Sequence, residues 1–181
     1  MRSNRALERG DVLKRSDAQR ATLGIRMKPV IQLEPTGCGI ASVAAIAGVS
    51  YSRAKSVANS LGIFADDRKL WSETAYVRKL LRHFGLRANS TEMPFHSWEA
   101  LPDLALLSIK WHLEKGRPFW HWVVFARENG RFYVLDPKKG LRQQTRTDFG
   151  RIKPKWFIRV ADTQPSLAAD APQAARRSRE R

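Results

Sequence analysis

The only cysteine in this chain lies at a position suited to nucleophilic chemistry. Cys38 stands between Gly37 and Gly39 in the stretch IQLEPTGCGIASVAAIAG, just ahead of a run of small apolar residues. If a helix begins there, the thiol lies at its N-terminal end, where unpaired N–H groups and the helix dipole stabilise an anion. The glycines add no bulk, so a substrate backbone could approach the sulfur. The competing interpretation is a small buried core residue, the commonest fate of an unpaired cysteine.

A nucleophilic thiol needs a base, and the base needs a partner that orients it. Of the four histidines, His83 and His96 are expected at the surface and His112 at the end of a strand. His121 lies within FWHWVVFA, the segment most typical of a strand. A histidine there is either a satisfied core residue or a positioned catalytic base.

A turn links His121 to a carboxylate. The pair Asn129-Gly130 is a strong hairpin signal, and a hairpin centred there sets residue 121 opposite a position between 136 and 138. Asp136, in the VLDP that ends the next strand, would then lie beside the imidazole. Asp-Pro is also ordinary turn chemistry, so only the register with His121 makes Asp136 a candidate.

Gln32, six residues before the cysteine, is the fourth candidate. Its side-chain N–H could stabilise an oxyanion together with the backbone N–H of Cys38. The alternative is a plain polar residue at the end of VIQLEP.

The elements that must position these four residues fall into two halves. Helices are predicted over residues 37–47, in SYSRAKSVANSLG with Ser50 or Ser52 as cap, and in WSETAYVRKLLRHFG with Ser72 as cap. Strands are predicted where aromatic and branched residues gather, over residues 86–90, 104–111, 119–126, 131–135 and 155–160. Helices first and antiparallel strands after them are typical of an α+β fold.

The chain divides into an arm, a domain and a tail. Residues 1–27 are polar and Arg-rich, which predicts a basic arm that is flexible or partly helical. Residues 162–181 have lost aromatic and β-branched residues, which predicts a disordered basic tail. Residues 28–161 are expected to form one domain. No stretch is apolar enough for a signal peptide or a transmembrane segment, so we expect a cytoplasmic protein.

The net charge of +16 bears on the partners of the protein. Its Lys and Arg residues are scattered along the chain, which argues against a specific nucleic-acid motif. An acidic peptide or an anionic surface explains the charge equally well. One cysteine excludes an intramolecular disulfide and metal sites that need several thiols, so no cofactor or metal is expected.

Two segments, QLEPTGCGIAS and HWVVFARENGRFYVLDP, resemble the bacteriocin-processing, double-glycine leader peptidase family of papain-like cysteine peptidases. The resemblance covers about residues 29–160. It implies a papain-like fold in which a helix bearing the nucleophile packs on an antiparallel sheet. It also implies that Cys38 is the nucleophile, His121 the general base and acid, Asp136 the residue that orients it, and Gln32 the oxyanion donor.

The predicted function is therefore a cysteine peptidase that cleaves a peptide or leader amide bond through a thioester. Two alternatives share the fold. One is acyl transfer, such as transglutamination, through the same thioester. The other is a non-catalytic papain-like module that binds peptides. Gly37 stands where the family commonly has aspartate, and the family's exporter portions have no counterpart in this sequence.

Overall fold

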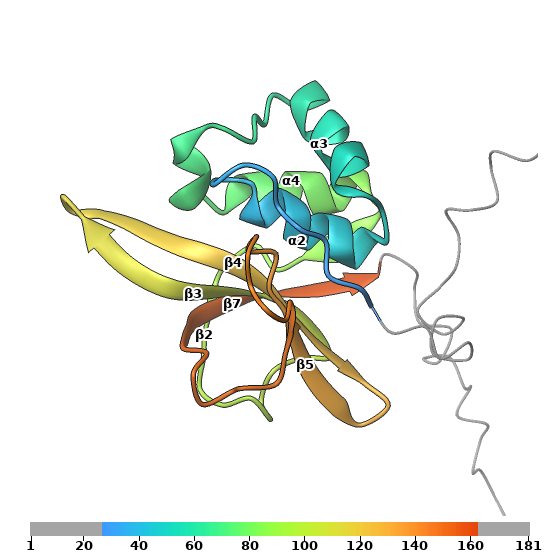
Figure 1. Ribbon diagram of the computed structural model, residues 1–181, viewed down its shortest axis with the longest axis vertical. Helices are drawn as coiled ribbons and strands as arrows, with labels where there is room; N and C mark the ends of the chain where they lie inside the picture. The colour runs from blue at the N-terminus through green and yellow to red at the C-terminus, as the bar shows by residue number, and fades with distance from the viewer. Residues whose placement is uncertain (1–26, 163–181) are drawn as a thin grey trace, which may run out of the picture.

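A computed structural model describes residues 27–162, so the predicted arm and tail lie almost wholly outside the described residues. Within this range helices precede a seven-stranded antiparallel sheet, which confirms the α+β prediction (Figure 1). The sheet has the order β1-β7-β3-β4-β5-β6, with β2 also paired to β7. The helical elements are α2 (Cys38–Ala47), α3 (Tyr51–Ser60), η1 (Arg68–Trp71) and α4 (Ala75–His83). The strands are β1 (Leu86–Ala88), β2 (Met93–Pro94), β3 (Leu104–Glu114), β4 (Arg117–Glu128), β5 (Arg131–Leu135), β6 (Thr145–Arg146) and β7 (Pro154–Asp162).

The caps of the helices explain where each one begins. Gly37 precedes α2, and the side chain of Ser50 caps α3 by accepting a hydrogen bond of 3.2 Å from the Arg53 N–H. The predicted cap Ser72 is wrong, because α4 begins after Thr74 and Ser72 instead follows η1. The short helix η1 had no predicted counterpart, since four residues are too few to show a helical period.

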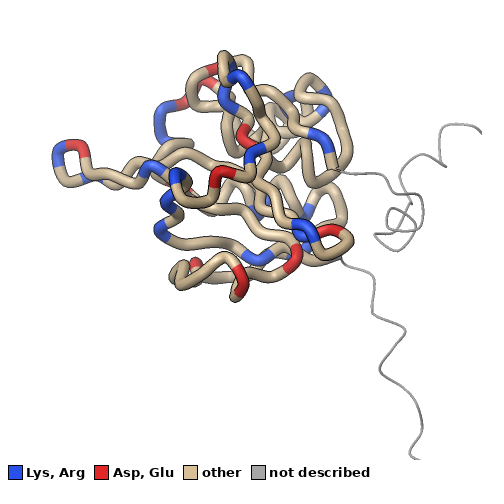
Figure 2. Tube along the Cα trace, turned by 60° about the horizontal axis from the view of Figure 1, so that its bottom comes forward, with Lys and Arg blue, Asp and Glu red and all other residues tan. Residues whose placement is uncertain are grey.

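The hairpin of β3 and β4 is longer than the sequence suggested. Both strands continue to a turn at Lys115 and Gly116, whose φ angles are 50° and 79°. The extra length projects from the body of the molecule beside η1 (Figures 1 and 2). Most of its residues are exposed, the apolar Leu113 among them, so the alternation of buried and exposed residues that marks a packed strand is missing there. Strands β2 and β6 were also not predicted, because each spans two residues.

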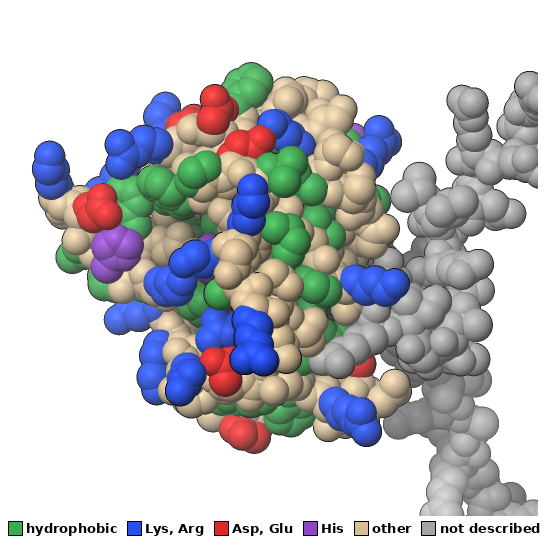
Figure 3. All heavy atoms as spheres, viewed as in Figure 1, with side chains coloured by type: hydrophobic (Ala, Val, Ile, Leu, Met, Phe, Trp, Pro, Cys, Tyr) green, Lys and Arg blue, Asp and Glu red, His purple; other side chains and the backbone are tan. Residues whose placement is uncertain are grey.

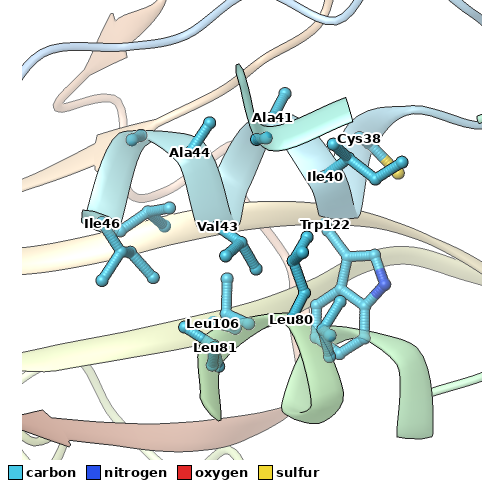
Figure 4. Packing of buried hydrophobic residues seen from close by; sticks show 14 of the residues in the cluster. Cys38, Ile40, Ala41, Val43, Ala44, Ile46, Leu80, Leu81, Leu106 and Trp122 are labelled. Atoms are coloured by element: carbon cyan, nitrogen blue, oxygen red, sulfur yellow. The ribbon is translucent and has the colours of Figure 1, made fainter. Parts of the chain in front are cut away.

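Alternate residues of the strands pack into two apolar clusters. Trp122 and Val124 of β4 lie in the cluster that contains α2, α3 and α4. Val123 and Phe125 lie in a second cluster with Leu107 of β3. This alternation is what a strand covered on both faces requires. Figure 4 shows α2 lying over this sheet with Cys38 at its N-terminal end.

Helix α2 is held close to its neighbours because it carries small residues. A Cβ atom added at Gly39 would overlap the ring and hydroxyl of Tyr76, a buried residue of α4. Every residue of α2 from Cys38 to Ile46 is buried. The position of Cys38 is therefore fixed by packing.

We predict that Gly39→Ala destabilises the fold by about 1–3 kcal/mol, although alanine is the better helix former, because overpacking a filled site costs more. The midpoint of urea unfolding measures this. Gly150→Ala is the matched control, since a Cβ there meets nothing within 4 Å. Adding Tyr76→Phe to Gly39→Ala should restore part of the loss. Equal stability of Gly39→Ala and the wild type would contradict this packing.

Candidate active site

Four elements bring the predicted residues together. Cys38 is the first residue of α2, His121 lies in β4, and Asp136 directly follows β5. Gln32 lies in the loop before α2, and its backbone N–H donates to the Pro137 carbonyl at 2.9 Å. This bond ties the loop that leads to the thiol to the segment that carries the carboxylate.

The imidazole of His121 and the carboxylate of Asp136 form the hydrogen bond that the hairpin register predicts. The distance from Nε2 of His121 to Oδ1 of Asp136 is 2.8 Å. The pairing of Val124 with Leu135 sets this geometry, because it carries the end of β5 alongside His121. With Nε2 engaged by Asp136, Nδ1 is the ring nitrogen left for the thiol.

Cys38 interacts with the same ring. Burial alone lowers the pKa of His121, but hydrogen bonds to Asp136 and Cys38, and the negative charge on both, raise it from 6.5 to about 9. The imidazole therefore lies between a carboxylate on one side and a thiol on the other. Its protonated form is the favoured one at neutral pH.

The carboxylate of Asp136 is fully buried, with 0% exposure. Besides the His121 ring, its Oδ1 accepts the Lys138 N–H at 3.1 Å, and its Oδ2 accepts from Arg146 at 3.1 Å. Burial raises the pKa of Asp136, yet the hydrogen bonds and charge of His121 and the bonds from Lys138 and Arg146 bring it below its ordinary value. The carboxylate is thus held ionised with both oxygens occupied.

Arg146 is the residue that the sequence reasoning missed. It bridges the buried Asp136 to the more exposed Asp148, whose carboxylate accepts from Nε at 3.0 Å and from a second nitrogen at 2.9 Å. This fork holds the guanidinium in one orientation. Arg146 belongs to the two-residue strand β6, which pairs with β5, and nothing in its sequence surroundings marks it.

Further cations surround the carboxylate. Burial lowers the pKa of Lys110, and the nearby charge of Lys138 lowers it further. Lys110 has a φ of 54° and lies where the pairing of β3 with β4 shifts register, just beyond the pair Ile109 and His121. The surroundings of the histidine and aspartate are therefore positively charged.

The two glycines beside Cys38 make room for neighbouring side chains. The prediction that they leave the sulfur open to a substrate backbone is therefore wrong. A Cβ at Gly37 would overlap the hydroxyl of Tyr51, as one at Gly39 would overlap Tyr76. Cys38 itself has 0% exposure, whereas the His121 side chain has 15%. The site meets solvent on the side of the imidazole.

The loop before Cys38 is pinned by hydrogen bonds. The carboxylate of Glu34 accepts from the Tyr51 hydroxyl and forms an ion pair with Lys55. The side-chain nitrogen of Gln32 donates to the carbonyls of Glu34 and Pro35, each at 2.9 Å. Both N–H groups of the Gln32 amide are thus engaged within the loop, and its buried oxygen has no hydrogen-bond partner among residues 27–162.

The other histidines lie apart from this group. His83 and His96 are exposed, as predicted. His112 lies in the projecting part of β3 and is also exposed; its Nε2 lies 3.1 Å from Oε1 of Glu114. In residues 27–162 no group of three His, Cys, Asp or Glu side chains is placed to hold a metal ion.

Comparisons with known proteins agree with the segments singled out in the sequence. Residues 26–162 match the family model described as the peptidase C39 family. A solved structure of a double glycine motif protease from an AMS/PCAT transporter, in complex with the leader peptide, aligns at 19% identity with a TM-score of 0.49. The alignment covers 76% of this chain and 93% of that one. The search of curated proteins found no match. No helix in residues 27–162 is long and apolar enough to cross a membrane.

We predict that the His121 ring titrates near pH 9, which a histidine NMR titration measures directly. Because this pKa is raised above 6.5, the interaction contributes stability below pH 6.5, and that contribution is lost as the pH rises through about 9. Asp136→Asn should move the titration to lower pH, since the carboxylate charge is removed. Titration at or below pH 6.5 in the wild type would contradict the assigned contacts.

We also predict that Arg146→Met destabilises the fold by about 1–3 kcal/mol, because it leaves a buried charged oxygen of Asp136 without its partner. The pKa of Asp136 rises in this variant, so on acidification it loses stability at a higher pH than the wild type. Asp148→Asn, which removes only the outer carboxylate, should change stability by less than about 1 kcal/mol. Equal losses in the two variants would show that Arg146 does not act through Asp136.

Proposed function

Because this chain belongs to the peptidase C39 family, we propose that it is a cysteine peptidase that hydrolyses an amide bond of a peptide through a thioester. The observation that carries the proposal is the position of the His121 ring between the thiol of Cys38 and the carboxylate of Asp136. The proposed peptidase domain comprises residues 28–161.

The proposed reaction begins with a proton on His121 and a negative charge on Cys38. The thiolate attacks the carbonyl carbon of the scissile bond, and the new C–S bond places the negative charge on the carbonyl oxygen. The imidazolium then gives its proton to the leaving nitrogen as the C–N bond breaks, which releases an amine and leaves a thioester.

The second half of the reaction uses His121 as a base. The neutral ring takes a proton from a water molecule, whose oxygen attacks the thioester carbon. Collapse of the tetrahedral intermediate breaks the C–S bond, releases the acid product and restores the thiolate beside the imidazolium. Asp136 orients the ring in both halves, and Arg146 is proposed as a positioning residue because it holds the carboxylate in place.

The oxyanion is proposed to form beside the first turn of α2. The Cys38 N–H belongs to that turn, whose N–H groups lack intrahelical acceptors. Gln32 is proposed as the second donor. Its amide nitrogen donates to two loop carbonyls, so one of these bonds must break before it reaches the substrate oxygen.

The substrate is proposed to be a peptide that carries a double-glycine leader. The support is the family and the resemblance of the segments around Cys38 and His121 to leader peptidases. The related transporter protease is described with a leader peptide bound.

Acyl transfer is the second candidate, and the burial of the thiol favours it. Cys38 has 0% exposure, and a site that excludes water gives an amine acceptor an advantage over hydrolysis of the thioester. The mass of the product separates the two reactions: hydrolysis adds the elements of water, whereas transfer adds the amine.

Cys38→Ala should lower the cleavage of quenched fluorescent peptides by at least about 10³-fold, since the nucleophile is removed. The peptides span a double-glycine leader junction, and a randomised panel accompanies them. Ser56→Ala, at an exposed position of α3, is the control and should keep full activity. The thermal midpoint verifies that Cys38→Ala is folded. Undiminished cleavage by folded Cys38→Ala would refute the proposed mechanism.

A further inference from the structure

A groove separates η1 from the projecting end of the β3–β4 hairpin. Its volume is about 730 Å³, and it is lined by Arg68, Glu114, Lys115, Arg117 and Phe119. Hydrophobic side chains lie between this hairpin and the helical layer, with Lys and Arg side chains around them (Figure 3). The groove therefore joins an apolar floor to a charged rim.

Phe119 is the aromatic residue that lines the groove, and its ring packs against two further rings. The ring of Phe119 packs edge-on against Trp71 of η1, with centroids 6.1 Å apart, and is stacked on His112 at 5.8 Å. The guanidinium of Arg68 lies over the Trp71 ring at 5.7 Å. The contact of Phe119 with Trp71 joins the hairpin to η1, so the groove is built into the fold.

The rim of the groove carries an excess of positive charge. Arg68, Lys115 and Arg117 form no ion pair with another residue in the described range 27–162. The single acidic residue, Glu114, faces His112, with Oε1 3.1 Å from the ring nitrogen. Three unpaired cations above an aromatic floor are complementary to a carboxylate carried on a peptide.

The groove lies along the strand that carries the proposed base, His121. Arg117, Phe119 and His121 are alternate residues of β4, so their side chains lie on the same side of the strand. At about 3.3 Å per residue, Arg117 lies about 13 Å along the strand from His121. From the other wall, Nε1 of Trp71 donates to the Pro35 carbonyl at 3.2 Å, within the loop that leads to Cys38.

We propose that this groove is a substrate subsite that takes an acidic residue about four positions from the scissile bond, because an extended peptide advances about 3.3 Å per residue. The proposal rests on the proposed peptidase function and adds to it a substrate class, a peptide with Asp or Glu at that distance. Arg117 and Arg68 bind the carboxylate, and Phe119 contacts the adjoining backbone.

The test measures kcat/KM of the full-length protein on quenched peptides that differ by Glu or Gln at one position, scanned over five positions on each side of the scissile bond. We expect Glu to be preferred about fivefold at one position three to five residues from the bond, the size of a favourable surface charge contact. Arg117→Glu and Arg68→Glu should each abolish or reverse this preference. The preference should also fade at 0.5 M salt, where exposed charges are screened.

The matched control is Arg131→Glu, which makes the same charge change at the exposed start of β5, beyond the other end of β4. It should keep the wild-type preference. The subsite is refuted if the wild type shows no acidic preference at these positions, or if Arg117→Glu and Arg68→Glu keep it.

Failure of the proposed function has a separate signature. If the wild type cleaves no peptide, the proposed subsite is tested by binding instead. Labelled peptides containing Glu or Gln are titrated with Cys38→Ala, and with the same arginine variants in that background, and binding is followed by fluorescence anisotropy. Tighter binding of the Glu peptide that is lost with Arg117→Glu and kept with Arg131→Glu supports the subsite. Equal binding of the two peptides overturns it.

Discussion

A buried carboxylate is the constraint on which the described structure of this site depends. Asp136 has no exposed surface, and a carboxylate in such a place is stable only if charged or N–H groups satisfy both oxygens. His121, Arg146 and the Lys138 N–H provide these bonds. Each comes from a different part of the sheet or the turn after it, so the carboxylate joins β4, β5 and β6 at one point.

The same carboxylate determines the state of the histidine. The negative charge of Asp136 and the contact with Cys38 together outweigh the burial that would otherwise keep the His121 ring neutral. Arg146 binds the other oxygen of the carboxylate, Oδ2, so Oδ1 accepts from the His121 ring and from the Lys138 N–H. The ring is therefore held in its protonated form between the Asp136 carboxylate and Cys38.

Much of this site could be predicted from the sequence because its signals are local. The helix after Cys38 shows in a run of small apolar residues, and the contact between His121 and Asp136 follows from one Asn-Gly turn and the register it imposes. Arg146 could not be found in this way, because it reaches Asp136 through a two-residue strand that has no pattern of its own.

Other features depended on contacts between distant segments. From the sequence, the glycines beside Cys38 suggest access for a substrate, whereas tyrosines 14 and 37 residues farther along fill that space. The groove beside η1 could not be predicted from the sequence either, since it needs the length of the β3–β4 hairpin and the edge-on packing of Phe119 against Trp71. Neither the length of the hairpin nor this ring contact follows from hydrophobic periodicity.

The central claim, a thiol activated by an imidazole that a carboxylate orients, is tested most directly by the rate of Cys38 alkylation with iodoacetamide at pH 6 and pH 8.5. The ratio of the two rates cancels the effect of burial on access. The account predicts a smaller fall in the rate at pH 6 in the wild type than in His121→Ala, because the protonated ring interacts with Cys38. A fall of about 100-fold at pH 6 in both proteins, as for an ordinary thiol with a pKa near 8.5, would contradict it.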